Sequence, residues 1–504
     1  MNNYLYMLIQ IFEYIYNEDV AMIEKEELIA NFIKDELTDV PNILNKELSN
    51  NNMKFNSREE LDEIKGYLDT FLKEDTSNKI IVLPGLRGVG KTTLILQAYE
   101  YLLKEKNIPP NNVLYISFDD LNDLVECNIR QMVEVYLKNI FHANLRNLDE
   151  KVFIFVDESQ IDKKWASSGK VIYDKSHNIF MIFTGSSALH LERSDDLARR
   201  MRKKSITPLN YTQHLKLKYG IDVSCLSADL RDLIFGGDIN NVLSSEFKAN
   251  NLLTNCLDYS STDWEEYFKF GGFPILFDKK SHREICEDLV EITQRVITKD
   301  MPQIKELSSE NQSNAKRILR YLALQQPGEL TQANLANYLK TSTANVNKIL
   351  DLLEKTHLIF HCEPYGGSAK RVKKSWKYYF ATPSIRHALS TKVGNPLLGS
   401  DDYEGFLLEN LVASNLFNLS NNQFTNFTIY YDADKKRNVD FLIQKDCENI
   451  IPIEVGRGKK KKLQIKHAIN KYNCQYGIVV ANNYSSVKKD DDVIYIPPKT
   501  FSFL

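Results

Sequence analysis

The chain has 504 residues, and at about 150 residues per domain this length leaves room for roughly three domains. Apolar residues make up 43% of it and charged residues 26%, with a formal net charge of −3. These values are typical of a chain that folds around cores, and they exclude a disordered chain, a collagen and a uniformly basic nucleic-acid coat. A net charge near zero still permits local basic patches.

Neither a membrane span nor a disulfide framework is indicated. The apolar stretch 4–12 lacks a basic flank, contains Gln10 and is followed by Glu13. It is too short to cross a bilayer, so an amphipathic helix is expected there. The seven cysteines are scattered without a C-x-x-C pair, which argues against a disulfide framework or a zinc site. We therefore expect a cytoplasmic protein without a membrane partner.

The pattern of apolar residues changes several times along the chain and predicts five regions. They are an N-terminal helical segment (1–75), an α/β core (76–205), a helical lid region (206–311), a winged helix-turn-helix (312–390) and a mixed α/β domain (400–504).

The second region carries the clearest pattern of strands. Short continuous apolar runs at 80–83, 113–118, 152–156 and 179–183 alternate with helical segments. Continuous runs of this length suit strands that are buried on both faces, as in a parallel sheet covered by helices. The predicted fold class is therefore α/β.

A phosphate-binding motif lies between the first of these strands and a predicted helix. Residues 85–92, GLRGVGKT, fit the pattern G-x-x-x-x-G-K-[ST] and follow the strand IIVLP. The glycines let the backbone approach phosphates closely, and the helix N-terminus adds partial positive charge. We expect Lys91 to reach the β and γ phosphates of ATP and Thr92 to ligate Mg²⁺. The predicted nucleotide contacts are Gly85, Leu86, Arg87, Gly88, Val89, Gly90, Lys91, Thr92 and Thr93.

Acidic and hydroxyl side chains follow two other predicted strands. The run 152–156 leads to Asp157 and Glu158. We expect Asp157 to bind Mg²⁺ through water and Glu158 to polarise the attacking water, and an exposed loop acid is the alternative for Glu158. The run 179–183 leads to Thr184 and Ser186, whose hydroxyls could sense the γ-phosphate or hold the attacking water. The alternative is a structural turn, because Ser/Gly turns are common after strands.

Five segments in this order resemble one family of ATPases. LPGLRGVGKTTL, FIFVDESQ, MIFTGSSALHL, ARRMRKKSITPLNY and YFKFGGFPIL are similar to segments of the archaeal-type AAA+ ATPases of the signal-transducing STAND group. In that family a Gly-Arg pair precedes a Pro-Leu element, and Arg199-Arg200 stands in its place here. The resemblance implies that Arg200 contacts the nucleotide or couples it to neighbouring elements. A basic end of a surface helix is the alternative.

The fourth region has the pattern of a winged helix. A helix over 314–327, a second helix capped by Thr331 and a third over 343–355 precede a hairpin. The side chains expected to contact nucleic acid lie on the third helix and on the basic wing, which also carries Lys377. They are Asn345, Asn347, Lys348, Lys370, Arg371, Lys373 and Lys374. A lid or a protein contact is the alternative function of this module.

Three carboxylates in the last region form a second candidate site. Glu409 lies on a predicted helix, Asp440 enters a strand and Glu454 ends another, so the three could converge on Mg²⁺ or Mn²⁺. Their order resembles the PD-(D/E)xK nuclease fold, which the same ATPase family often carries. That fold has a lysine two positions after the second acid, where this chain has Gly456. Losing a group that stabilises transition-state charge typically lowers the rate by about 10²–10³. We therefore expect a degenerate, nuclease-like domain kept for binding or architecture.

These observations leave three functions open. We favour an ATPase that couples its nucleotide state to nucleic-acid binding through the C-terminal half. The alternatives are a metal-dependent nuclease licensed by ATP and a signalling scaffold whose nucleotide state exposes protein-binding surfaces. An oligomer or a protein partner is compatible with each.

Overall fold

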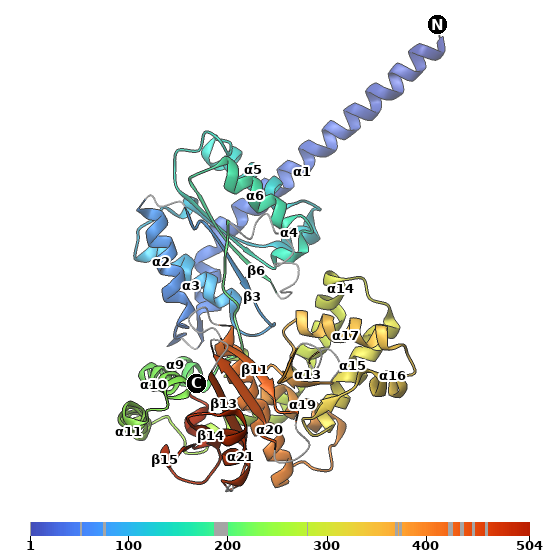
Figure 1. Cartoon of the computed structure of the whole chain (residues 1–504). Helices are drawn as coiled ribbons and strands as arrows, with labels where there is room; N and C mark the ends of the chain where they lie inside the picture. Colours follow the sequence, from blue (N-terminus) through green and yellow to red (C-terminus); the bar gives the residue numbers. More distant parts are fainter. Residues whose placement is uncertain are drawn as a thin grey trace. The chain divides into compact units, whose positions relative to one another are not determined.

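The computed structural model describes residues 2–50, 53–73, 77–185, 200–279, 281–367, 371, 375–421, 427–433, 438–445, 449–458 and 462–504 (Figure 1). The chain forms two compact units. Unit 1 comprises residues 1–85 and 91–206, and unit 2 comprises residues 86–90 and 207–504. None of the described helices is both long enough and apolar enough to cross a membrane.

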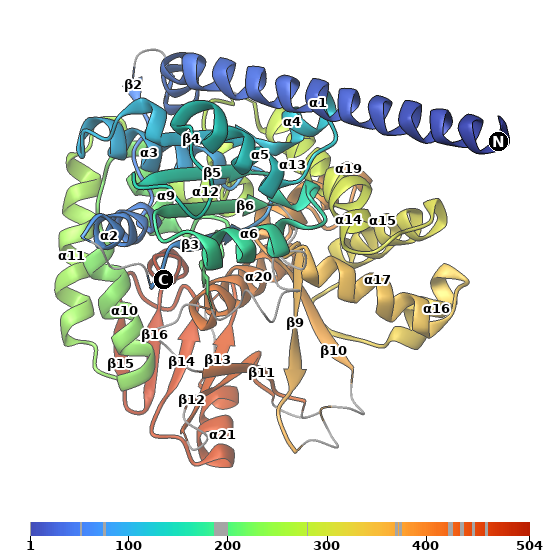
Figure 2. The same cartoon turned by 90° about the horizontal axis from the view of Figure 1, so that it is seen from above.

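Unit 1 contains a parallel sheet with the strand order β4-β5-β6-β3-β7. Figure 2 shows the first four of these strands side by side. The strands are β3 (Ile80–Pro84), β4 (Val113–Ser117), β5 (Val152–Asp157), β6 (Ile179–Gly185) and β7 (Arg202–Lys203). Strands β3, β5 and β6 are buried along their whole length, which confirms the strands expected from continuous apolar runs. Strand β6 pairs in parallel with both β3 and β5, so the carboxyl ends of all three strands lie at one edge of the sheet.

Helices cover both faces of this sheet. They are α1 (Asn2–Leu48), α2 (Glu60–Leu72), α3 (Lys91–Lys104), α4 (Phe118–Leu124), α5 (Ile129–Tyr136) and α6 (Trp165–Lys175), with short helical turns η1 (Pro110–Asn112), η2 (Leu137–Phe141) and η3 (Ser159–Ile161) and a small hairpin β1 (Ser49–Asn50) and β2 (Met53–Lys54). On one face, Ile33 of α1 and Trp165 of α6 pack with strand residues such as Ile154. On the other, Phe71 of α2 contacts the ring of Phe153.

Unit 2 begins with helices and continues into a mixed sheet. Its helices are α9 (Tyr211–Tyr219), α10 (Ser224–Gly236), α11 (Asn240–Asn255), α12 (Asp263–Phe270), α13 (His282–Arg295), α14 (Met301–Ile304), α15 (Ser309–Leu324), α16 (Gln332–Leu339), α17 (Thr343–Lys355), α19 (Pro383–Val393), α20 (Asp401–Ser420), α21 (Leu463–Tyr472) and α22 (Pro498–Phe501), with the turns η4 (Pro274–Leu276) and η5 (Val296–Asp300). The Thr331 side chain accepts a hydrogen bond from the Asn334 backbone, which confirms the expected cap of α16.

The sheet of unit 2 has nine strands in the order β15-β16-β14-β13-β12-β11-β9-β10-β8. They are β8 (Glu329–Leu330), β9 (Ile359–Pro364), β10 (Trp376–Phe380), β11 (Phe427–Tyr431), β12 (Phe441–Lys445), β13 (Asn449–Val455), β14 (Gly477–Val480), β15 (Lys488–Asp490) and β16 (Val493–Ile496). Parallel pairing of Tyr430 in β11 with Glu363 in β9 joins the β9–β10 hairpin to the C-terminal strands. One sheet therefore runs through the two regions 312–390 and 400–504.

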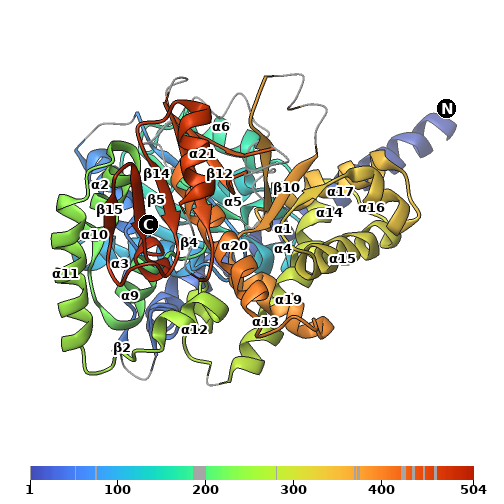
Figure 3. The same cartoon turned by 60° about the horizontal axis from the view of Figure 1, so that its bottom comes forward.

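Two cores flank this sheet. Residues of α20 pack with Phe441, Ile453 and Val455 on one face, and residues of α21 pack with Leu442 and Val479 on the other. Figure 3 shows α21 lying over the C-terminal strands. This layering follows from the alternation of side chains along a strand.

His387 in α19 gives unit 2 a pH-dependent stability. Burial is the main reason why the pKa of His387 falls from 6.5 to about 4, and the charge of Lys269 lowers it further. An unfolded chain takes up a proton here below about pH 6.5 and the folded chain does so only near pH 4, so the stabilisation is complete above this window and decreases as the pH falls through it. We expect it to decrease by about 2 kcal/mol between pH 7.5 and pH 5.

A His387→Gln variant tests this expectation. Urea unfolding of both proteins at pH 7.5 and pH 5 should give a smaller difference between the two pH values in the variant. The buried His214, whose pKa is also lowered by burial, keeps part of the same dependence in both proteins. Equal differences in wild type and variant would contradict the assignment to His387.

Candidate nucleotide-binding site

The phosphate-binding motif connects β3 to α3, as the sequence predicts. Gly88 has φ +80° and Gly90 has φ +93°, a left-handed backbone that side chains with a Cβ rarely adopt. A Cβ atom at Gly85 would come within 2.3 Å of the Ile206 carbonyl oxygen. Glycine is therefore needed here for backbone conformation and for close packing, and α3 begins at Lys91 with its N-terminus directed to the loop.

Lys91 and Thr92 occupy the first turn of α3. Lys91 is buried, and its ammonium group donates a hydrogen bond of 3.1 Å to the Gly85 carbonyl oxygen. The Thr92 hydroxyl donates a hydrogen bond of 2.5 Å to Oδ2 of Asp157 at the end of β5. Two residues expected to share a magnesium ion thus lie in direct contact, although they are 65 positions apart in the chain.

Asp157 is held in place from several sides. Its Oδ1 accepts a hydrogen bond of 3.0 Å from the Glu158 backbone and another from the hydroxyl of Thr184, at the end of β6. Thr184 is fully buried, so its hydroxyl orients Asp157 and is not available to a γ-phosphate. A hydroxyl and a carboxylate in contact beside a phosphate loop provide the oxygen ligands that Mg²⁺ prefers, so these residues fit that ion.

Glu158 has an unusual backbone conformation. Its φ is +51°, which costs a residue with a Cβ roughly 1–2 kcal/mol. The Gln160 side chain donates a hydrogen bond to Oε2 of Glu158. This hydrogen bond orients the carboxylate of Glu158, which directly follows Asp157 in the chain. Gln160, which is buried, was missed by sequence reasoning, because only the structure shows its contact with Glu158.

Arg200 and Ser186 are the two other candidate catalytic residues, and the structure describes only Arg200. Arg200 donates a hydrogen bond of 2.8 Å to Asp174, near the end of α6. Two residues later, Arg202 pairs with Ile81 near the start of β3, so Arg200 lies at the edge of the sheet opposite to the phosphate loop. The structure therefore does not bring Arg200 to the loop of its own chain, because the length of β3 separates them. Ser186 lies outside the described residues.

The middle of the phosphate loop, residues 86–90, is grouped with unit 2. Arg87 donates hydrogen bonds of 3.1 Å from Nε and 3.0 Å from Nη2 to Oδ1 of Asp300, which is fully buried at the end of η5. A Cβ at Gly88 would lie 3.1 Å from Ile275 and 3.4 Å from Ile292. Asp300 was missed by sequence reasoning, since no motif contains it and its partner is 213 positions away.

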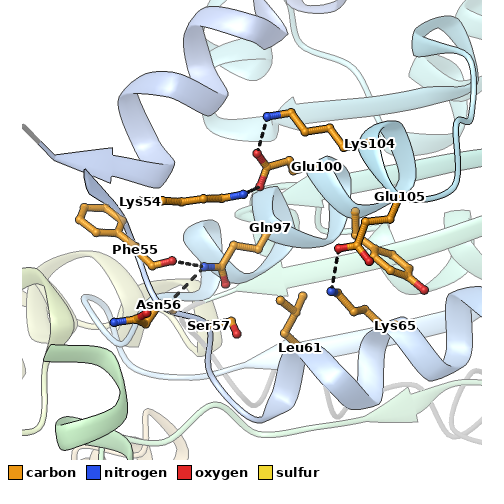
Figure 4. A pocket seen from close by; sticks show the side chains of 11 residues that line it. Lys54, Phe55, Asn56, Ser57, Leu61, Lys65, Gln97, Glu100, Lys104 and Glu105 are labelled. Atoms are coloured by element: carbon orange, nitrogen blue, oxygen red, sulfur yellow. Dashed lines mark hydrogen bonds and ion pairs between the residues drawn. The ribbon is translucent and has the colours of Figure 1, made fainter. Parts of the chain in front are cut away.

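A crevice of about 460 Å³ lies along α3 within unit 1 (Figure 4). Gln97 donates to the carbonyl oxygens of Phe55 and Asn56, both at 3.4 Å. Charged side chains around it pair with one another, as Glu100 does with Lys54 at 2.5 Å. These ion pairs compensate the charges that line the crevice. The Lys54 pair connects β2 to α3, and the Gln97 hydrogen bonds connect the segment after β2 to the same helix.

The candidate nucleic-acid contacts are only partly available. The Asn345 amide donates hydrogen bonds to Asn311 at 2.6 Å and to Thr341 at 3.1 Å, so it is engaged within the helices. Asn347 is exposed and Lys348 is half-buried on α17. Arg371 donates to the Gly366 carbonyl oxygen at 2.9 Å and lies over the ring of Tyr430. Three other candidates lie outside the described residues, namely Lys370, Lys373 and Lys374.

Lys377 does not belong to an exposed wing, contrary to expectation. It is only 9% exposed, and its ammonium group lies 3.6 Å from Oε1 of Glu409. Lys377 lies within β10, whose neighbouring strands β8 and β9 pair with it on both sides. A central strand position buries the side chain, which a count of basic residues along the chain cannot show.

The three carboxylates of the expected metal site do not form one. Within the described part of the chain, no group of three or more His, Cys, Asp or Glu side chains is close enough to hold a metal ion. Ile453 and Val455 face α20, so strand alternation directs Glu454 to the opposite face, whereas Glu409 lies on α20 itself. The sheet therefore separates Glu409 from Glu454, and this arrangement does not fit a three-carboxylate metal centre.

Comparison with known proteins assigns the chain to a family. A family model described as an AAA domain matches residues 77–215. The chain is 31% identical over 501 residues to the uncharacterized protein MJ1637 of Methanocaldococcus jannaschii, which covers 99% of this chain and 98% of that protein. The chain belongs to the family of this archaeal protein. It carries an AAA-type domain of the P-loop ATPase fold, followed by two domains of unknown function, DUF8612 over 261–396 and DUF4143 over 404–501.

The chain is also similar to a bacterial protein and to a solved archaeal structure. An uncharacterized protein of Haemophilus influenzae is 22% identical over 343 residues, which are 66% of this chain and 74% of that protein. The solved Walker-type ATPase PABY2304 of Pyrococcus abyssi is similar at 17% identity and a TM-score of 0.33, with 66% of this chain and 95% of that chain covered.

Proposed function

We propose that the protein binds and hydrolyses ATP at the end of the β3–β5–β6 sheet. The contact between Thr92 and Asp157, next to Lys91, carries this proposal. Thr92 and Asp157 would hold Mg²⁺, which when bound neutralises charge on the phosphate oxygens. Lys91 would exchange its hydrogen bond with the Gly85 carbonyl for one with the phosphates.

Glu158 is the residue that we assign to the attacking water. Its carboxylate, oriented by Gln160, would accept the hydrogen bond that aligns water with the γ-phosphoryl group. Catalysis would then consist of positioning and electrostatic stabilisation, which is what phosphoryl transfer requires. Thr184 acts through Asp157 and is a positioning residue.

Lys91→Ala tests the binding step. We expect this variant to lose binding of a fluorescent ATP analogue at concentrations that saturate wild type, because the ammonium group that neutralises the β and γ phosphates is removed. Lys104→Ala, at the other end of the same helix, is the matched control and should bind normally. Unchanged affinity and turnover in Lys91→Ala would overturn the assignment.

We further propose that the nucleotide state is coupled to nucleic-acid binding through unit 2. Support comes from helices α15, α16 and α17, followed by the β9–β10 hairpin, an order that is typical of a winged helix. The face at the start of α17 carries Asn347 and Lys348, which can reach phosphates or base edges. A scaffold that binds protein through the same face is the competing function.

Salt dependence distinguishes the two functions. We expect double-stranded DNA to bind with an affinity that falls steeply with salt, and Lys348→Ala to reduce the slope of log affinity against log salt by about 1. Lys392→Ala, which removes an exposed lysine of α19, should leave this slope unchanged. A DNA affinity that is the same in wild type and Lys348→Ala at every salt concentration would favour the scaffold.

A further inference from the structure

Two adjacent residues of α20, Glu409 and Asn410, bind strand β10. The Asn410 side chain accepts a hydrogen bond of 3.1 Å from the Phe380 N–H and donates one of 2.8 Å to the Phe380 carbonyl oxygen. Glu409 accepts a hydrogen bond of 2.8 Å from the hydroxyl of Tyr379. These bonds are buried, so each satisfies polar groups that water does not reach.

Lys377 completes this contact as a cation. Its ammonium group lies 3.6 Å from Oε1 of Glu409 and 5.5 Å from the centre of the Tyr431 ring. Both charged side chains are about nine-tenths buried, and a buried carboxylate requires a nearby positive charge or hydrogen-bond donors. Lys377 supplies the charge and Tyr379 supplies a hydrogen bond.

The ionisation of Lys377 agrees with this geometry. Burial alone would lower the pKa of Lys377, but the charges of Glu409 and Asp440 hold it above its usual value. Lys377 therefore stays protonated and positively charged. Burial raises the pKa of Glu409 to about 7; the Lys377 charge opposes this rise and the Asp440 charge adds to it, so the carboxylate form of Glu409 predominates only above about pH 7.

The two acids expected to accompany Glu409 are engaged elsewhere. Oδ2 of Asp440 accepts a hydrogen bond of 2.7 Å from the Val455 backbone, which ties the start of β12 to the end of β13. Glu454 lies on the opposite face of the sheet, where its paired neighbour Val479 packs under α21. The direct partners of Glu409 are thus Lys377 and Tyr379, which both belong to β10, while Asp440 acts on Glu409 only through its charge.

We propose that Lys377 is the resident cation of Glu409, and that Glu409 and Asn410 clamp β10 to α20 in place of a metal centre. The clamp joins the β9–β10 hairpin, which belongs to the helix-rich module, to the helix that covers the C-terminal strands. The parallel pairing of β9 with β11 reinforces the same junction. The hairpin and the C-terminal sheet therefore move as one body, and a ligand bound at the hairpin would carry the sheet with it.

Metal binding by the full-length protein tests the first half of the proposal. Thermal unfolding is measured without nucleotide, with and without millimolar MnCl₂, in wild type and in Glu409→Gln. We expect the same shift in Tm on adding Mn²⁺ in both proteins. A stabilisation by Mn²⁺ that is present in wild type and absent in Glu409→Gln would show that Glu409 is a metal ligand, and would overturn the proposal.

A double-mutant cycle tests the second half. Lys377→Met leaves Glu409 without its cation and should lower Tm by roughly 10 °C, as breaking a buried pair does in a domain of this size. The double variant Lys377→Met/Glu409→Gln should regain a large part of this loss, because no buried charge is left uncompensated. Lys392→Met is the control for an exposed lysine and should leave Tm within about 1 °C. Additive losses in the double variant would overturn the clamp.

Discussion

Glu158→Gln is expected to bind ATP like wild type and to hydrolyse it at least about 10²-fold more slowly, the usual effect of removing a catalytic base. The amide keeps the size of the side chain and the contact with Gln160, but it accepts the water proton far less readily. Because Thr92, Asp157 and Lys91 are untouched, ATP affinity should stay within a few-fold of wild type. Steady-state phosphate release and equilibrium binding of a fluorescent ATP analogue measure the two quantities.

A matched control separates this effect from the effect of neutralising any acidic side chain of unit 1. Glu134→Gln replaces a half-buried acid of α5 that pairs with Arg130, away from the phosphate loop and from Asp157, and it should leave turnover unchanged. Equal turnover in Glu158→Gln and wild type would remove Glu158 from the proposed mechanism. A joint loss of turnover and ATP binding would instead indicate that Glu158 supports the architecture of the loop.

Arg87→Ala is expected to lower the free energy of unfolding of unit 2 by about 3–5 kcal/mol, because it removes the cation from a fully buried carboxylate. Asp300→Asn should cost less, since an amide can be buried at a smaller penalty than a charge. The double variant Arg87→Ala/Asp300→Asn should be more stable than Arg87→Ala alone. Chemical denaturation followed by a probe within unit 2 gives the three values.

Arg295→Ala is the control for this prediction. Arg295 pairs with Glu291 on the exposed face of α13, where an ion pair contributes about 0–1 kcal/mol. A loss in Arg87→Ala no larger than that in Arg295→Ala would show that the pair with Asp300 contributes little. Because Arg87 lies within the phosphate loop, ATP affinity of the same variants will show whether the pair also shapes the loop for nucleotide.

Some of this protein was predictable from local patterns. The strands at 80–84, 152–157 and 179–185 follow from continuous apolar runs, since a strand buried on both faces needs apolar residues at every position. The phosphate loop follows from a spacing that only a strand-turn-helix context satisfies. The position of Asp157 beside Thr92 was also predictable. Parallel strands end at one edge of the sheet, so an acid at the end of β5 lies near the phosphate loop that follows β3.

Contacts between distant residues were not predictable in this way. Asp300 and Gln160 belong to no motif, and their roles appear only when Arg87 and Glu158 are seen beside them. Arg200 matches a family element in position, yet the length of β3 separates it from the loop of its own chain.

The C-terminal carboxylates show most clearly which features the sequence determines and which depend on the tertiary structure. The sequence by itself determined that Glu409 lies on a helix, that Asp440 leads into a strand and that Glu454 lies on another, and that position 456 is a glycine and not a lysine. Only the tertiary structure decided that the sheet separates Glu409 from Glu454 and that Lys377, from another strand, approaches Glu409. The physical reason is that a local pattern specifies which face of its own element a side chain occupies, whereas the partner it meets depends on how the elements pair and pack.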